Sequence, residues 1–267
     1  HNHDKEKKYL DIFCYGKISN IQLAKMIKKK INVLPRYLLE PIIILNRFIS
    51  NYIKFFSIHE INTKSYRDVN DLYSIYSPNL KFSKKELDMG KSILKEMGLE
   101  ENSKFVCFVI RDSKYKEKSS LLKNDMSHHD FRNFNSDNFI KAAEKIAEKG
   151  FYVIRMGKNT EKKFISKNKM VIDYSNSKFR SDFMDIYLGA HCEFCVTTAT
   201  GIDTIPLIFK KPIAAIVVPL GYIQTYNDRF INITKHHYLN GRKLNAKEIF
   251  ENNLGFLLDT KFFKKKN

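Results

Sequence analysis

The sequence lacks any uncharged apolar run long enough to cross a lipid bilayer, which takes about 20 residues. Its longest apolar stretch, residues 38–56, is interrupted by Glu40, Arg47 and Lys54. The apolar positions recur at helical spacing, so we expect an amphipathic helix that packs on a protein core in preference to lying on a membrane surface. A signal peptide, with its basic start and apolar middle, is also missing from the given sequence.

Cysteine is scarce, with four residues in 267. Three of the four lie in apolar, strand-like runs, where a free thiol behaves as a small buried apolar group. Cys192 and Cys195 have the spacing of a metal or redox pair, but neither a second pair nor a nearby histidine cluster accompanies them. We therefore expect reduced thiols in a cytoplasmic protein rather than a zinc or redox centre.

Acidic residues are few beside basic ones, 29 against 47, which leaves a net charge of +18. Clustered positive charge attracts nucleic acid, but these lysines are scattered and no nucleic-acid-binding motif accompanies them, so we expect no nucleic-acid partner. The positive field instead favours anionic substrates such as nucleotide diphosphates. It also allows peripheral contact with an anionic membrane, at the inner face of the plasma membrane.

Strand-like and helix-like segments alternate from residue 105 onward. The expected strands are 105–110, 151–156, 171–174, 193–197 and 213–218, and the expected helices are 137–149, 160–167, 181–190 and 201–209. Such alternation produces right-handed βαβ units and a parallel sheet.

The first eighty or so residues carry fewer elements, and the sequence divides near residue 82. We expect a strand at 9–15, a helix at 21–29, the apolar helix, and an irregular connection over 61–82. Ser83 and Glu86 have capping-box spacing, which predicts a helix start. We therefore predict a partial N-terminal domain with its linker over 1–82 and a Rossmann-like domain over 83–267.

Polar residues follow the expected strands where a parallel sheet binds its ligands, at the carboxyl ends. They are Arg111 and Asp112 after the first strand, Arg155, Gly157 and Lys158 at the second, Asp173 and Tyr174 at the third, and Thr197, Thr198, Thr200 and Gly201 at the fourth. Small hydroxyl residues and a glycine that lead into a helix can hold a diphosphate on free amides. The alternative is that Thr200 simply caps the helix.

Several blocks together resemble a bacterial family of GT-B-type glycosyltransferases, whose members are encoded with surface-polysaccharide genes. The blocks are 131–133, 152–157, 171–174, 180–185 and 197–206. The segment 200–212 is also similar to the donor-site helix of heptosyltransferase-like GT-B enzymes. The resemblance implies an α/β protein of GT-B type, with a C-terminal Rossmann-like parallel sheet that binds the donor and a partial or reduced N-terminal α/β domain.

What the resemblance implies about activity is transfer of a sugar from a nucleotide-sugar donor to a surface-glycan or lipid-linked acceptor. It implies no cofactor and no metal, and the sequence lacks the Asp-x-Asp pair that would hold one. Arg155 and Lys158 are the candidates for stabilising the leaving diphosphate. The expected donor-binding residues are Arg111, Arg132, Arg155, Gly157, Lys158, Asp173, Tyr174, Thr197, Thr198, Thr200, Gly201 and Thr204.

A polar segment, 111–133, supplies the candidates for the general base that an acceptor hydroxyl requires. They are Asp112, His128, His129 and Asp130. In this segment Arg132 and Asn133 have two open roles, contact with substrate or attachment of the segment to the sheet.

Two other activities stay open at this stage. A polysaccharide pyruvyltransferase shares the GT-B architecture, and a non-catalytic Rossmann-like protein would bind a nucleotide without turnover. Because a GT-B enzyme has a full first domain and the sequence does not begin with Met, we also expect that part of the first domain is missing from it.

Overall fold

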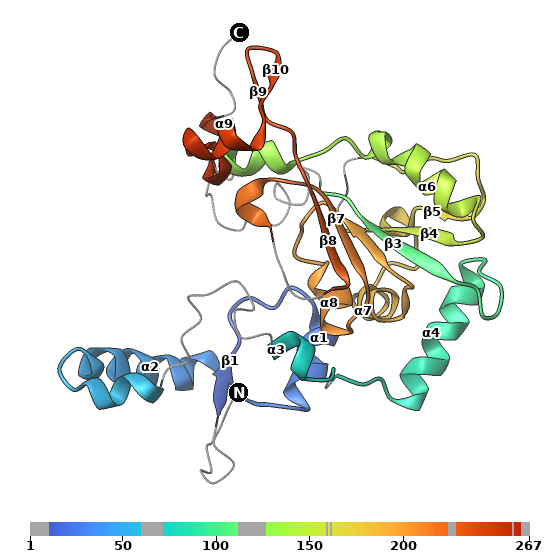
Figure 1. The fold of residues 1–267 in the computed structure, drawn as a ribbon. Coiled ribbons are helices and arrows are strands. Elements are labelled where there is room, and N and C mark those ends of the chain that lie inside the picture. The colour runs from blue at the N-terminus through green and yellow to red at the C-terminus, as the bar shows by residue number, and fades with distance from the viewer. Residues whose placement is uncertain are drawn as a thin grey trace. The chain divides into compact units, whose positions relative to one another are not determined.

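The computed structural model describes residues 11–59, 72–78, 80–111, 127–158, 160, 162–223, 228–257 and 259–262. The chain forms two compact units, residues 1–70 with 79–81 (unit 1) and residues 71–78 with 82–267 (unit 2). Unit 1 has a two-stranded sheet, and unit 2 contains a six-stranded sheet (Figure 1).

Unit 1 is built on two parallel strands joined by a helix. Its elements are β1 (Ile12–Cys14), α1 (Ile21–Lys28), β2 (Asn32–Leu34), α2 (Arg36–Ser50) and the 3-10 helix η1 (Lys54–His59). The side chain of Asn20 caps α1 by accepting the Leu23 amide at 2.8 Å. The expected first strand and first helix are therefore present.

The apolar helix α2 presents most of its apolar side chains to the outside. Tyr37, Ile42 and Phe48 are 75%, 60% and 61% exposed, and Leu39 is the one buried residue of the helix. In the described residues, the prediction of a core-packed helix is therefore wrong for most of this apolar face. None of the helices in the described ranges is long and apolar enough to cross a membrane.

Unit 2 carries the larger sheet and most of the helices. Its strands are β3 (Phe105–Val109), β4 (Tyr152–Met156), β5 (Val171–Ile172), β6 (Cys195–Thr197), β7 (Ile213–Val218), β8 (Phe230–Thr234), β9 (Tyr238–Leu239) and β10 (Arg242–Lys243). Its α-helices are α3 (Leu72–Ile75), α4 (Lys84–Glu96), α6 (Ile140–Ala147), α7 (Asp182–His191), α8 (Thr204–Ile208) and α9 (Ala246–Glu251). Its 3-10 helices are η2 (Ser127–Arg132), η3 (Ser136–Phe139), η4 (Tyr174–Asn176), η5 (Leu220–Tyr222), η6 (Leu254–Phe256) and η7 (Thr260–Phe262).

The main sheet has the order β5-β4-β3-β6-β7-β8, and all of its strand pairs are parallel. Numbered along the chain, this is the 3-2-1-4-5-6 order of doubly wound nucleotide-binding sheets. The predicted α/β class and parallel sheet are confirmed. From β3 the chain goes on to β4 and β5 towards one edge of the sheet, and from β6 it goes on to β7 and β8 towards the other edge. The strand order therefore reverses between β3 and β6.

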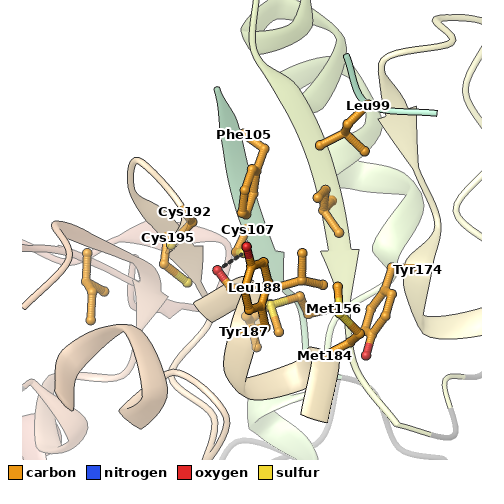
Figure 2. Packing of buried hydrophobic residues seen from close by; sticks show 13 residues of the cluster. Leu99, Phe105, Cys107, Met156, Tyr174, Met184, Tyr187, Leu188, Cys192 and Cys195 are labelled. Carbon is orange, nitrogen blue, oxygen red and sulfur yellow. Dashed lines mark hydrogen bonds between the residues drawn. The ribbon is translucent and has the colours of Figure 1, made fainter. Parts of the chain in front are cut away.

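Alternate residues of β3 supply two cores, one on each face of the sheet. Phe105, Cys107 and Val109 belong to the core that includes residues of α7, and Figure 2 shows this packing. Val106 and Phe108 belong to the other core, with residues of α6. Because both faces are covered, β3 reads as a continuous apolar run in the sequence. Cys107, Cys192 and Cys195 are buried, free thiols, as expected for reduced cysteines.

The cap of α4 is confirmed as the sequence predicts it. The Ser83 hydroxyl accepts the Glu86 amide at 3.3 Å, and the Glu86 carboxylate accepts the Ser83 amide at 2.7 Å. Farther along the helix Gly90 lies against Tyr187 of α7, so closely that a Cβ atom on it would be 2.1 Å from the ring. This glycine lets α4 and α7 approach each other.

One expected helix is absent, and one strand is present where none was predicted. Thr160 and residues 162–167, the described part of an expected helix, form none, because the Lys162 carbonyl bonds to Arg155 and the Phe164 amide to Asp173. The edge strand β8 was not expected, since polar Asn232 separates its two exposed isoleucines.

Candidate functional site

The polar residues that follow β3 and β6 meet where the strand order reverses. The Thr198 amide donates to the Val109 carbonyl at 3.1 Å, and the Arg111 amide donates to the Thr198 hydroxyl at 2.9 Å. These bonds join the carboxyl ends of the two strands. In doubly wound sheets this point is where ligands bind.

The turn between β6 and α8 uses its own backbone amides. The Ala199 amide donates to the Thr197 hydroxyl at 3.1 Å, and the Thr200 amide donates to Asp203 at 2.8 Å. The amides of Ala199 and Thr200 are therefore already bonded within the turn, and binding of a diphosphate by this segment stays a prediction. Thr200 does not cap the helix, because the cap position of α8 is Asp203, which makes no side-chain cap bond. The hydroxyl of Thr204 donates to the Gly201 carbonyl at 2.8 Å.

Positive side chains also gather at the carboxyl ends of β3 and β6, which we call the carboxyl edge of the sheet, and they attract anions. The Arg132 guanidinium donates to the Ala199 carbonyl at 2.8 Å and lies 3.9 Å from the centre of the Tyr222 ring. Burial, followed by the positive charge of Arg132, lowers the pKa of Arg111. Burial and Arg132 also lower the pKa of Lys235, whose ammonium lies 4.3 Å from the centre of the Phe134 ring. Arg132 is thus close enough to repel both Arg111 and Lys235, and all three cations are partly buried.

Several polar atoms at this edge have no partner. Among the described residues, the Arg111 Nε, the Arg132 Nε and the Thr200 hydroxyl are buried without a hydrogen bond. Within the described residues, no acid lies within 4.0 Å of Arg111, Arg132 or Lys235 to form an ion pair. Unpaired buried donors are costly, and an anionic ligand with several oxygens would satisfy them. We call Arg111, Arg132, Thr200, Tyr222 and Lys235 the edge cluster.

Asp203 organises the turn to which Arg132 of the edge cluster is bonded. Its Oδ2 accepts both the Thr197 hydroxyl and the Thr200 amide, each at 2.8 Å. Burial raises the pKa of Asp203 to about 6, and its two hydrogen bonds and the charge of Arg132 oppose that rise.

A second group of the expected donor residues forms a separate network that joins β4 to the β4–β5 connection and to the residues after β5. The Arg155 side chain has no exposed surface. It donates to the Lys162 carbonyl at 2.7 Å, to Thr160 at 3.2 Å and to Ser175 at 3.3 Å, and lies 3.5 Å from Asp173. These contacts fasten the connection between β4 and β5, so a ligand could reach Arg155 only if that connection opened.

The neighbours of Arg155 have structural partners as well. Asp173 accepts the Phe164 amide at 2.9 Å. The Tyr174 hydroxyl donates to Asp185 at 2.8 Å, and burial raises the pKa of that phenol. Gly157 has a φ of 149° and packs against Thr160, while Lys158 beside it is exposed. No hydrogen bond among the described residues joins this network to the edge cluster.

The candidates for a general base are only partly placed. Asp112 lies outside the described residues, and the side chains of His128 and His129 in η2 do as well. Asp130 is exposed, and its carboxylate accepts a hydrogen bond from the side-chain amide of Asn133 at 3.1 Å. In the described ranges no three His, Cys, Asp or Glu side chains are placed to hold a metal ion. The assignment of a base stays a prediction.

Sequence reasoning missed three residues at the edge. Tyr222 follows β7 in η5, and its only signal was its place after a strand. Lys235 follows β8, which was itself missed. Asp203 lies inside the segment that carries the resemblance, but no pattern gave it a role.

Comparisons with known proteins give one structural neighbour. No family model and no curated protein match the sequence. Among solved structures, the ADP-heptose lps heptosyltransferase II of E. coli is similar, with a TM-score of 0.39 and 12% sequence identity. The match covers 68% of this chain and 54% of that one, so the aligned part spans about half the length of the neighbour.

Proposed function

We propose that this protein is a glycosyltransferase whose unit 2 holds the diphosphate of a nucleotide-sugar donor at the edge cluster. The observation that carries the proposal is the pair of partly buried arginines, Arg111 and Arg132, which among the described residues have neither a hydrogen bond to Nε nor an acid within 4.0 Å. Arg180 differs, because its Nε is also without a hydrogen bond but its guanidinium forms an ion pair with Asp185. Arg111 and Arg132 lie where a sheet of this strand order binds nucleotides. The sequence blocks that resemble GT-B glycosyltransferases support the same substrate class.

The chemistry suits a leaving group that gains negative charge. When a sugar is transferred, the bond to the donor diphosphate breaks and its oxygen becomes more negative. Guanidinium groups stabilise that charge, since they present parallel N–H donors to phosphate oxygens. Arg111 and Arg132 take this role in the proposal in place of Arg155, because the contacts of Arg155 hold the β4–β5 connection.

The remaining parts of the proposal concern the acceptor. The acceptor is a surface glycan or a lipid-linked sugar, as the resemblance implies, and Asp112, His128, His129 and Asp130 remain the candidates for its general base. The basic side chains of the edge cluster make a metal ion unnecessary for holding the donor. Activity is proposed at the cytoplasmic side of the membrane.

A thermal-shift screen tests the proposal and separates it from its alternatives. The ligands are UDP-, GDP-, CMP- and ADP-sugars, the matching free nucleotides, and phosphoenolpyruvate. We expect one class of nucleotide sugar to raise the melting temperature, because a ligand that binds only the folded protein stabilises it. Stabilisation by phosphoenolpyruvate alone would favour a pyruvyltransferase. Binding of a nucleotide sugar without transfer or hydrolysis would favour a binding protein, and no response to any nucleotide would refute the donor site.

A further inference from the structure

The turn between β6 and α8 is held by one carboxylate oxygen. The Oδ2 of Asp203 accepts the Thr197 hydroxyl and the Thr200 amide, both at 2.8 Å. The same Thr197 hydroxyl oxygen accepts the Ala199 amide at 3.1 Å. Asp203 therefore holds Thr197 and Thr200 directly, and it holds Ala199 through Thr197. The Thr198 amide bonds instead to the Val109 carbonyl.

The conformation that Asp203 holds is one that the backbone does not prefer. Ala199 has a φ of 59°, in the left-handed region where residues with a Cβ atom are uncommon. Such a residue stays there only when its surroundings determine it. Here the bond from its own amide to Thr197, and from Thr197 to Asp203, supplies that constraint.

The left-handed residue is also the one that meets the edge cluster. The Ala199 carbonyl accepts Arg132 at 2.8 Å, and the Tyr222 ring lies against the same guanidinium at 3.9 Å. The carbonyl and the ring fix two sides of the guanidinium. If Ala199 moved to a right-handed conformation, its carbonyl would turn, and Arg132 would lose the acceptor that orients it.

We propose that Asp203 is a positioning residue of the anion site, which acts through Thr197 and the Ala199 carbonyl to orient the guanidinium of Arg132. The proposal rests on the proposed function insofar as it concerns ligand binding. A simple helix cap does not account for Asp203, because it makes no side-chain cap bond to α8 and its Oδ2 points back to residues before it. Among the described residues, the charged or titratable groups that interact electrostatically with the Asp203 carboxylate are Arg132 and the buried Cys195 thiol.

Two variants separate a positioning role from general destabilisation. Asp203→Ala removes the acceptor, whereas Asp203→Asn can keep it, because a single oxygen receives both bonds and an amide carbonyl can replace it. Arg132→Ala and the double variant complete a cycle, which reveals whether two residues act through each other. Thermal melts of all variants ensure that only folded protein is compared.

The first readout needs no ligand. In ligand-free protein with ¹⁵N-labelled arginine, the Arg132 Nε resonance, assigned by its loss in Arg132→Lys, should carry a ring-current shift from Tyr222. We expect that shift to collapse in Asp203→Ala and to persist in Asp203→Asn. An unchanged shift in folded Asp203→Ala would overturn the inference, whatever the protein binds.

The second readout is affinity for inorganic pyrophosphate by calorimetry. We expect Asp203→Ala and Arg132→Ala each to weaken binding about tenfold relative to the wild type. The double variant should bind no more weakly than either single variant, about tenfold below the wild type. The affinity of Asp203→Asn should stay within about threefold of that of the wild type. Single effects that multiply in the double variant would overturn the inference. If the wild type does not bind pyrophosphate, the proposed function loses support, and the arginine resonance still decides the role of Asp203.

Discussion

Replacing Asp203 by asparagine should make the protein less sensitive to pH between 5 and 7. Burial raises the pKa of Asp203 from 3.8 to about 6 in the folded protein. The folded protein therefore holds this proton more tightly than the unfolded chain does, and ionisation of Asp203 opposes folding. The stability lost to this ionisation is largest above pH 6 and is recovered as the pH falls from 6 towards 3.8.

The size of the effect follows from the two pKa values. A shift of roughly 2 units corresponds to about 3 kcal/mol at neutral pH, of which about half remains at pH 5. The wild type should therefore gain about 1 kcal/mol relative to Asp203→Asn when the pH falls from 7 to 5. The carboxylate that holds the turn in place thus costs stability at neutral pH, as functional sites often do.

Urea unfolding of both proteins at pH 7 and pH 5 measures this gain. The comparison between variants cancels the other titrating groups, including Asp185, whose pKa is also raised by burial. A difference in unfolding free energy that is the same at both pH values would show that Asp203 titrates normally in the fold. The burial argument for the turn would then be refuted.

Three further predictions test other parts of the structure. Arg155→Ala should cost about 3–5 kcal/mol of stability, measured by urea unfolding, because it leaves the buried acceptors of the β4–β5 connection unpaired; a stable variant would show that the network is dispensable. Gly90→Ala should lower the melting temperature, because its Cβ atom would overlap the Tyr187 ring, at a cost of about 1–3 kcal/mol. Ser92→Ala on the exposed side of the same helix is the control, and equal melting of the two variants would contradict the close approach. If the exposed apolar face of α2 meets anionic lipid, the chain should float with phosphatidylglycerol vesicles but not with phosphatidylcholine ones, and Phe48→Glu should abolish flotation; equal flotation of both proteins would exclude α2 as the contact.

The sequence predicts the centre of the sheet well because burial on both faces leaves a plain pattern there. Residues 105–110 are a continuous apolar run, and β3 occupies five of those six positions. The edge strand β8 has no such pattern, since Ile231 and Ile233 are exposed while its inner residues are only partly buried. Its position depends on pairing with β7, which is a tertiary interaction.

Helical periodicity in α2 predicts a helix but not what covers it. The spacing of apolar residues is the same whether the face meets a core or the outside. Similarly, the composition of residues 160–167 suited a helix, but Arg155 and Asp173 take the backbone groups that a helix would use. These hydrogen bonds come from residues on other elements, so the local sequence does not reveal them.

The sequence directs attention to the carboxyl ends of the strands, but it does not reveal all the side chains that gather there. Carboxyl ends of strands collect polar residues, which drew attention to Arg111 and the turn after β6. Whether backbone amides or side chains are available to a ligand depends on the internal bonds of the turn, and these are formed by Asp203. Tyr222 and Lys235 follow β7 and β8, far along the chain, and only the order of the strands in the sheet places them at the site.

Binding of nucleotides by the Arg111→Ala variant tests the central claim most directly. Arg111 has a buried Nε without a partner among the described residues, so its loss should remove ligand contacts while leaving the fold intact. Arg229, which is exposed and precedes β8 at the amino edge of the sheet, provides the matched control. Calorimetry with UDP, GDP and ADP should show one nucleotide bound by the wild type and by Arg229→Ala, and bound at least about tenfold more weakly by Arg111→Ala. Equal affinity of all three proteins, or no binding of any nucleotide by the wild type, would contradict a donor site at this edge.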